Sequence, residues 1–474
     1  NDKMRFEQLS TALKFAPQNW EIHYQLARHY ISTGNSDKAE QHFASCIKLN
    51  PSYGVPHFEF GLLLLDRDKI LPAANEFKTA LDIEPNNPMY LALDALTSAL
   101  TNQQQRALDN ITIALGKGPN DARILYYAGL VYKNIGRYES AIQKFNEALT
   151  LDPSNALALE ALGDIHMEQT QFKGAAEKYF KAWEKGGYSE KRAFKLGNAL
   201  LYDSKFIEAK DFYETIIKRN PGFSEALFRL TFIYCELGDL KSARSTLPLF
   251  KNDGTPWMQI AQGKIYETEN NLEAALVAYK IAKRVTPDNP YIHSGFGRIY
   301  LKQKLFDSSI IEFSAAAAAD TLNMQLLINL GSAFEEMGDP SSAFQYYSEV
   351  QRRYPEHNNV HMKMAQIKAR EGKYEEAAKI CEEGIKYHPS DAELYFTLGK
   401  QYQKAEKYEP AIEAFQTALK KGKGQPVDAL RYIGNIYYDH VINNKKAKEF
   451  YKRYVKAGGN SPEVAEAMKK LEGI

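Results

Sequence analysis

Apolar residues recur every three or four positions along this chain, in paired stretches separated by short polar turns. The segment 123–155, RILYYAGLVYKNIGRYESAIQKFNEALTLDPSN, shows the pattern. Apolar residues at this spacing share one face of a helix, so the segment predicts two amphipathic helices. Gly136 and Arg137 mark the turn between them. Pro153 ends the second helix, because proline supplies no amide donor and clashes with the preceding turn.

This pair of predicted helices recurs at nearly every step of 34 residues, and a small residue marks each recurrence. An Ala commonly follows the small residue twelve positions later and an aromatic residue sixteen positions later, as Ala141 and Phe145 follow Gly129. We expect the small residues to let the two helices approach closely and the rings to fill the space between neighbouring units. Most Tyr and Phe side chains are therefore predicted to lie in the core between repeats, since such a unit cannot bury its apolar face alone. The small residues, called the ladder residues below, are Ala27, Gly61, Ala95, Gly129, Gly163, Gly197, Thr231, Gly263, Gly297, Gly331, Ala365, Gly399 and Gly434.

The repeats resemble the tetratricopeptide repeat (TPR), a helix-turn-helix unit of 34 residues. The resemblance covers about thirteen units from Trp20 to Val455. It implies an all-α fold, a right-handed α-solenoid or TPR superhelix. We predict half a repeat over 1–19 (the second helix of a preceding unit), repeats 1–7 over 20–255, repeats 8–13 over 256–460, and a capping helix over 461–474. The half repeat suggests a chain cut from something longer.

The predicted boundary at residue 255 rests on an irregular seventh repeat. This repeat is two residues short, and Leu247-Pro248-Leu249 places a proline inside its second helix, where a helical hydrogen bond is lost. The following segment, KNDGTP (251–256), predicts a loop. We expect the curvature of the stack to change there.

Composition narrows the classes of function. Hydrophobic residues make up 44% of the chain, charged residues 25%, and the formal net charge is +1, so the chain is neither disordered nor broadly basic, and no nucleic-acid partner is expected. No apolar run reaches the ~20 residues of a membrane span. Cys46, Cys235 and Cys381 lie in separate repeats and cannot pair with each other. Unpaired cysteines favour a cytoplasmic location but leave a bacterial periplasm or envelope open.

Motifs for catalysis are missing from the sequence, which has no GxxxxGK[ST], no dinucleotide-binding glycine fingerprint, no HExxH and no CxxC. Histidines recur at one repeat position, as His23 and His57 do, but no third metal ligand accompanies them. We therefore predict no catalytic residue, no metal site, no cofactor and no enzymatic activity.

A run of basic residues lies near the C-terminus, in NNKKAKEFYKRYVK (443–456). Such a run can bind anionic lipid or nucleic acid. We interpret it here as the solvated face of a terminal helix.

The TPR resemblance implies that first helices line an inner groove, where two sets of residues are candidates for partner binding. The first set is apolar and belongs to repeats 2 to 4. Exposed apolar patches commonly mark binding sites, but a tightly wound stack or the chain's own missing N-terminal part would also cover these residues. The apolar set comprises Phe58, Leu62, Leu65, Met89, Leu96, Tyr126 and Leu130.

The second set is basic and aromatic and belongs to repeats 8 to 12. Lys264 and Arg298 hold the same position in successive repeats and should lie within reach of one ligand. Cationic and amide donors beside aromatic rings suit an acidic segment or a C-terminal carboxylate. The alternative is a solvated wall balanced by Glu267, Glu335 and Glu336. The basic-aromatic set comprises Trp257, Lys264, Tyr291, Arg298, Asn329, Lys363 and Lys400.

These features predict a non-enzymatic scaffold that binds segments or helices of partner proteins in the concave groove within a larger assembly. The alternative is a regulatory or targeting arm of an enzyme or of a bacterial envelope or secretion machine, whose working or anchoring part lies upstream of residue 1. The carboxylate clamp of chaperone-binding TPR proteins is approached only by Arg431 and Asn435, so binding of chaperone tails is not expected. The partner and the oligomeric state stay open.

Overall fold

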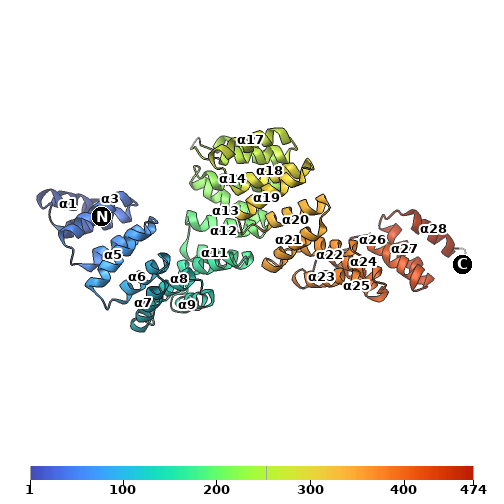
Figure 1. The fold of residues 1–474 in the computed structure, drawn as a ribbon, viewed down its shortest axis with the longest axis horizontal. Coiled ribbons are helices and arrows are strands. Elements are labelled where there is room, and N and C mark those ends of the chain that lie inside the picture. Colours follow the sequence, from blue (N-terminus) through green and yellow to red (C-terminus); the bar gives the residue numbers. More distant parts are fainter. Residues whose placement is uncertain (1, 252–253, 473–474) are drawn as a thin grey trace. The chain divides into compact units, whose positions relative to one another are not determined.

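The computed structural model describes residues 2–251 and 254–472, and it confirms the predicted all-α repeat fold (Figure 1). Short turns join the helices, and the described residues contain no β-strand. The chain divides into two compact units. Unit 1 comprises Asn1–Glu168 and Phe172–Ala199, and unit 2 comprises Gln169–Gln171 and Leu200–Ile474.

The helices of unit 1 are α1 (Asp2–Phe15), α2 (Trp20–Ser32), α3 (Ser36–Leu49), α4 (Gly54–Asp66), α5 (Ile70–Ile83), α6 (Pro88–Leu100), α7 (Gln104–Lys117), α8 (Ala122–Asn134), α9 (Tyr138–Leu151), α10 (Ala156–Glu168) and α11 (Phe172–Gly186). Helix α12 (Glu190–Tyr202) ends just beyond the last residue of this unit.

The α-helices of unit 2 are α13 (Phe206–Arg219), α14 (Ser224–Glu236), α15 (Leu240–Thr246), α16 (Trp257–Thr268), α17 (Leu272–Val285), α18 (Pro290–Lys302), α19 (Phe306–Ala319), α20 (Met324–Met337), α21 (Pro340–Arg353), α22 (Asn358–Arg370), α23 (Tyr374–Tyr387), α24 (Ala392–Lys404), α25 (Tyr408–Lys421), α26 (Asp428–Asn435), α27 (Asn444–Lys456) and α28 (Pro462–Glu472). A 3-10 helix covers Leu247–Leu249, and a π-helix covers Ile436–His440.

Many first helices begin at an Asn or Asp side chain. The Asn87 side chain accepts hydrogen bonds from the backbone N–H groups of Met89 and Tyr90, and Pro88 occupies the first helical position, where no donor is needed. Between the two helices of a repeat the backbone turns through a left-handed residue, as at Gly136 with φ +80°. Local sequence therefore sets both the start of a first helix and the turn that follows it.

The ladder residues allow close packing of the two helices of each repeat, as predicted. A Cβ atom on Gly129 would lie 2.4 Å from a ring carbon of Phe145, sixteen residues later. The same ring position also contacts the next repeat, because a Cβ on Gly295 would lie 2.4 Å from the ring of Tyr279. The prediction that these aromatic rings lie in the core between repeats is confirmed for these positions.

The seventh repeat is irregular where the sequence predicted it to be. Its second helix, α15, ends at Thr246 and continues as the 3-10 helix that contains Pro248, whereas α17 of the next repeat runs for 14 residues. Residues 252 and 253 of the predicted loop lie outside the described residues. The boundary at residue 255 stays a prediction, while the two compact units meet in sequence near residue 200.

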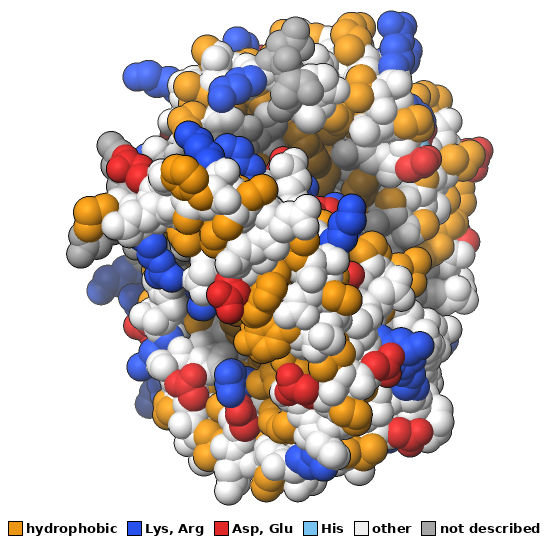
Figure 2. Space-filling view, turned by 90° about the vertical axis from the view of Figure 1, so that its left-hand side faces the viewer, with side chains coloured by type: hydrophobic (Ala, Val, Ile, Leu, Met, Phe, Trp, Pro, Cys, Tyr) orange, Lys and Arg blue, Asp and Glu red, His pale blue; other side chains and the backbone are white. Residues whose placement is uncertain are grey.

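Charges of both signs are mixed on the surface that Figure 2 shows, with exposed hydrophobic side chains between them. This mixture fits a formal net charge of +1 for the whole chain. Among the described residues, none of the helices combines the length and the hydrophobicity that a membrane span requires.

Candidate functional site

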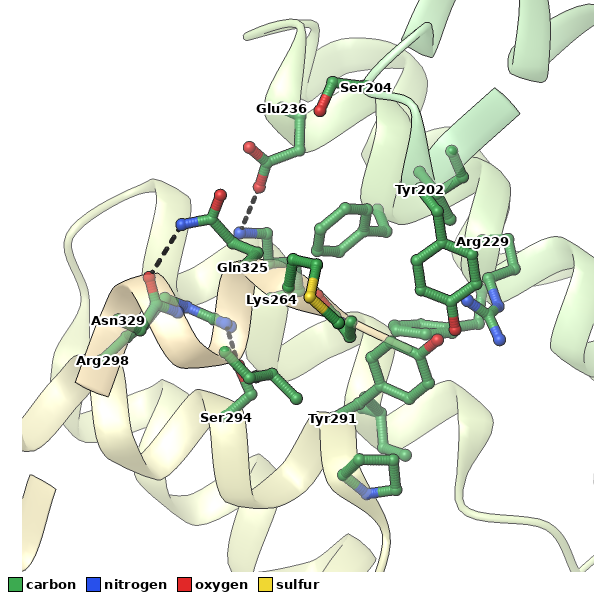
Figure 3. Close-up of a pocket in the computed structure, with 18 of the residues that line it drawn as sticks. Tyr202, Ser204, Arg229, Glu236, Lys264, Tyr291, Ser294, Arg298, Gln325 and Asn329 are labelled. Carbon is green, nitrogen blue, oxygen red and sulfur yellow. Dashed lines mark hydrogen bonds and ion pairs between the residues drawn. The ribbon is translucent and has the colours of Figure 1, made fainter. Parts of the chain in front are cut away.

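A cavity of about 320 Å³ lies in unit 2 between the first helices α14, α16, α18 and α20 (Figure 3). Residues 201–206, at the end of α12 and the start of α13, form a further wall. Aromatic rings and aliphatic side chains line one part of the cavity, and amide, hydroxyl and charged groups line the other. The lining includes Tyr202, Ser204, Phe228, Arg229, Phe232, Glu236, Lys264, Tyr291, Ser294, Arg298, Gln325 and Asn329.

Contacts between residues far apart in sequence hold the wall of the cavity in place. The Tyr202 hydroxyl donates a hydrogen bond to the carboxylate of Asp320 at 3.2 Å, across 118 residues of sequence. The Tyr354 hydroxyl donates to the carboxylate of Asp203 at 2.6 Å, across 151 residues. Both contacts lie within unit 2. In a stack of repeats, each repeat is rotated slightly relative to the one before it. Residues that are 118 or 151 positions apart therefore meet only if the rotations of all the repeats between them add up correctly.

Two predicted cations of the cavity are paired with carboxylates of the preceding repeat. The Lys264 ammonium lies 2.7 Å from Glu236, and it also lies 4.9 Å from the centre of the Phe232 ring. Arg298 donates to both carboxylate oxygens of Glu267, at 2.6 and 2.8 Å, and a third N–H group donates to the Ser294 hydroxyl at 2.6 Å. These pairs join successive first helices.

The Glu267 carboxyl is buried, with 5% of its surface exposed. Burial acts to raise its pKa, but the charge and hydrogen bonds of Arg298, together with the charge of Lys264, outweigh burial and lower the pKa of Glu267 to about 2. The carboxylate therefore stays ionised at neutral pH, and the Arg298–Glu267 pair forms a fixed part of the cavity wall.

The aromatic part of the cavity is built around Phe228 and Tyr291. The Trp257 ring stacks on Phe228 with ring centres 5.3 Å apart, and Tyr291 contacts Phe228 edge to face at 4.8 Å. The Arg229 guanidinium lies 4.8 Å from the centre of the Tyr291 ring and donates to Glu225 at 3.1 Å. Burial raises the pKa of Tyr291 to about 12, so its hydroxyl stays protonated.

The structure brings four residues of the basic-aromatic set to this cavity, namely Lys264, Tyr291, Arg298 and Asn329. Trp257 stands behind Phe228 in the wall. The other two lie further along the array. Lys363 donates to the Ser332 hydroxyl at 3.3 Å and lies 3.9 Å from Glu335, and Lys400 lies 5.8 Å from the centre of the Phe396 ring.

Sequence reasoning did not assign Tyr202, Ser204, Glu236, Ser294 or Gln325 to a site. No sequence pattern around Tyr202 and Ser204 points to a binding site, because their segment reaches the cavity only through the winding of the repeats in unit 2. A recurrent spacing between carboxylates and cations could have identified other pairs, although not that of Glu236 with Lys264, which lie 28 residues apart. Glu267 precedes Arg298 by 31 residues, and Asp164 precedes Lys195 by the same 31.

The apolar set packs within unit 1. Leu96 is buried, and Phe58, Leu62, Leu65, Met89 and Leu130 are partly buried against the same core cluster. Tyr126 is partly buried against a neighbouring cluster. Helix α6 is covered on all sides, and even Asp94 is buried, where it accepts hydrogen bonds from Arg106 and Asn110. The tight packing that the sequence left open as an alternative is present at α6, and partner binding by this set stays a prediction.

Clusters of metal-binding side chains are not found in the part of the chain that the structure describes: no group of three or more His, Cys, Asp and Glu could hold an ion there. The three cysteines are free and buried.

Comparison with known proteins matches TPR sequence families in four segments. The family described as "TPR repeat" matches residues 129–170. Families described as "Tetratricopeptide repeat" match residues 21–53, 335–398 and 368–431.

Curated relatives are similar over longer stretches. Tetratricopeptide repeat protein 6 of Homo sapiens is 27% identical over 36% of this chain and 33% of its own length. BBSome complex member BBS4 of Bos taurus is 24% identical over 64% of this chain and 58% of its own length. Protein CTR9 homolog of Arabidopsis thaliana is 23% identical over 82% of this chain and 35% of its own length. The chain thus spans between about a third and three fifths of these relatives.

Among solved structures, the APC/C hetero-tetramer Cut9-Hcn1 contains a chain similar to this one, with a TM-score of 0.45 and 13% identity. The likeness covers 97% of this chain and 98% of that chain.

Proposed function

Since this chain belongs to the tetratricopeptide repeat family, we propose that it is a non-enzymatic scaffold that binds partner proteins within a larger assembly, with a partner segment held in the cavity between α14, α16, α18 and α20. The cavity carries the proposal, because it combines apolar walls with a few convergent polar groups, the usual composition of a ligand site. The name of one relative, a BBSome complex member, supports a role in an assembly.

The ion pairs of the cavity favour a partner segment without net charge. The sequence predicted an acidic or carboxylate-bearing ligand for Lys264 and Arg298. Each of these cations already has a carboxylate within 2.7 Å, and a ligand carboxylate would have to compete with it. Asn329 and Gln325 offer amide groups instead, joined to each other by one hydrogen bond of 3.0 Å. We infer that these amides hydrogen-bond the main chain of a segment whose apolar side chain contacts the partly exposed Phe232.

Filling the cavity tests this function. Asn329 is partly exposed and its printed contact is with its helix neighbour Gln325, so Asn329→Trp should fill the space and keep the fold. Ser314→Trp, at an exposed position of α19, is the matched control. A photo-crosslinking residue at position 329 should capture a partner that position 314 does not, and Asn329→Trp should prevent co-purification of that partner. Equal capture at both positions, or unchanged co-purification, contradicts the proposal.

A second candidate is a TPR arm of a longer polypeptide with its own activity. It is favoured by a relative whose name is that of an enzyme, Protein O-mannosyl-transferase TMTC3 of Homo sapiens, which is 24% identical over 48% of this chain and 21% of its own length. Sequencing the full reading frame separates the two, because this candidate requires a catalytic or anchoring segment next to the repeats.

A further inference from the structure

The C-terminal part of unit 2 is strongly basic, in contrast to the rest of the chain. Between Lys420 and Lys470 there are twelve Lys and Arg residues against five Asp and Glu, a formal charge of +7 in a chain whose total is +1. All other residues together therefore carry a net negative charge. A field of one sign over so short a stretch attracts ligands of the opposite sign.

Three of these basic residues line a cleft of about 580 Å³ between α25 and α27. Lys420, Arg453 and Lys456 stand at the cleft and are exposed, and its apolar floor comes from the partly buried Leu419 and the buried Leu430 and Phe450. The Arg453 guanidinium lies 4.9 Å from the centre of the Phe450 ring.

These cations have few carboxylate partners. Arg453 lies 3.9 Å from Glu449, one turn away on the same helix, an exposed pair of small energetic weight. Lys420 and Lys456 take part in none of the ion pairs found among the described residues of this region. Their charge is therefore available to a ligand, unlike that of Lys264 and Arg298.

We propose that this cleft binds an acidic segment of a partner protein that also carries large apolar side chains. The cations would pair with Asp and Glu side chains at the rim, and a Leu or Phe side chain would contact Leu419, which is the partly exposed part of the apolar floor. The three cations lie on the second helices α25 and α27, and no residue that lines this cleft also lines the cavity between α14, α16, α18 and α20, so the two sites are independent.

Other polyanions fit this surface less well. Single-stranded nucleic acid is commonly held by exposed aromatic rings on which bases stack, but Phe450, Tyr451 and Tyr454 of α27 are all buried. A helix that lies on a membrane presents its apolar face to lipid. In α27 the apolar side chains other than Val455 are buried in the core.

Fluorescence anisotropy on the full chain tests the proposal. The probe is a short fluorescein-labelled peptide in which pairs of Glu alternate with single Leu residues. We expect saturable binding that weakens as salt is raised, because exposed charge pairs are screened. The triple variant Lys420→Glu, Arg453→Glu and Lys456→Glu should bind the peptide roughly tenfold more weakly or worse, as expected from losing several surface ion pairs.

The matched control reverses three exposed lysines on other second helices, Lys78 of α5, Lys181 of α11 and Lys280 of α17, and so changes the net charge equally. This control variant should keep wild-type affinity, and circular dichroism should show both variants folded. An equal loss in both variants means attraction by net charge alone and overturns the proposal. Tighter binding of a single-stranded RNA, or unchanged binding when Ser replaces each Leu of the peptide, overturns the assignment to an acidic, apolar segment.

Discussion

The two basic regions of unit 2 use their cations in opposite ways. Around the cavity, Lys264 and Arg298 lie in contact with Glu236 and Glu267 and tie successive first helices together. At the C-terminal cleft, Lys420 and Lys456 are exposed and without an ion pair among the described residues. In the sequence, Lys264 and Arg298 recur at one repeat position, whereas Lys456 belongs to a continuous basic run. The difference teaches that Lys and Arg residues suggest a site for an acidic ligand only where no carboxylate of a neighbouring repeat pairs with them.

Removing a carboxylate from the cavity should have the largest effect. Glu267→Ala leaves the Arg298 guanidinium without its bidentate partner in a buried site, so we expect unit 2 to lose about 3–5 kcal/mol of unfolding free energy. Glu273→Ala, at an exposed position of the next helix α17, should cost under about 0.5 kcal/mol. Urea unfolding of both variants measures the difference. Equal stabilities would mean that the Arg298–Glu267 pair does not support the fold.

Acid should weaken the same pair. The pKa of Glu267 is lowered from its ordinary value of 4.5 to about 2, so the folded carboxyl holds its proton less readily than the unfolded one. Its stabilisation, about 3 kcal/mol for such a shift, is complete above pH 4.5 and is lost as the pH falls towards 2.

Urea unfolding at about pH 6 and about pH 3 checks this dependence. The wild type should lose about 2 kcal/mol more than Glu267→Gln over this interval, because only the wild type carries the titrating group. Parallel losses in the two proteins would contradict the assignment of the shift to Glu267.

The repeat architecture could be predicted from the sequence because its determinants are local. Gly129 and Phe145 meet within one repeat, so their spacing in the sequence was enough to predict this contact. Pro248 likewise ended α15 as predicted, since the loss of a helical donor acts at the residue itself. The burial of the apolar set was harder to predict from the sequence. Whether Leu96 faces a groove or the core depends on how closely α6 and α8 pack.

The candidate cavity could be predicted only in part. Lys264, Tyr291, Arg298 and Asn329 came together because they occupy first helices of three successive repeats. Tyr202 reaches the same cavity through its hydrogen bond to Asp320, which depends on the summed rotation of every repeat between them. The spacing of 31 residues that pairs Glu267 with Arg298 was present in the sequence and is the signal that would have identified a structural cation.

Two matched substitutions test the contrast between the regions most directly. Lys264→Met removes a paired cation and Lys456→Met an unpaired one. We expect Lys264→Met to lower the unfolding free energy by about 1 kcal/mol, since the Glu236 carboxylate that loses its partner is partly exposed. The affinity for the Glu-Leu peptide should be unchanged. Lys456→Met should leave stability unchanged and weaken peptide binding roughly threefold. The account is contradicted if Lys264→Met weakens peptide binding or if Lys456→Met destabilises the fold. In either case, paired cations would not serve stability alone and unpaired cations would not serve binding alone.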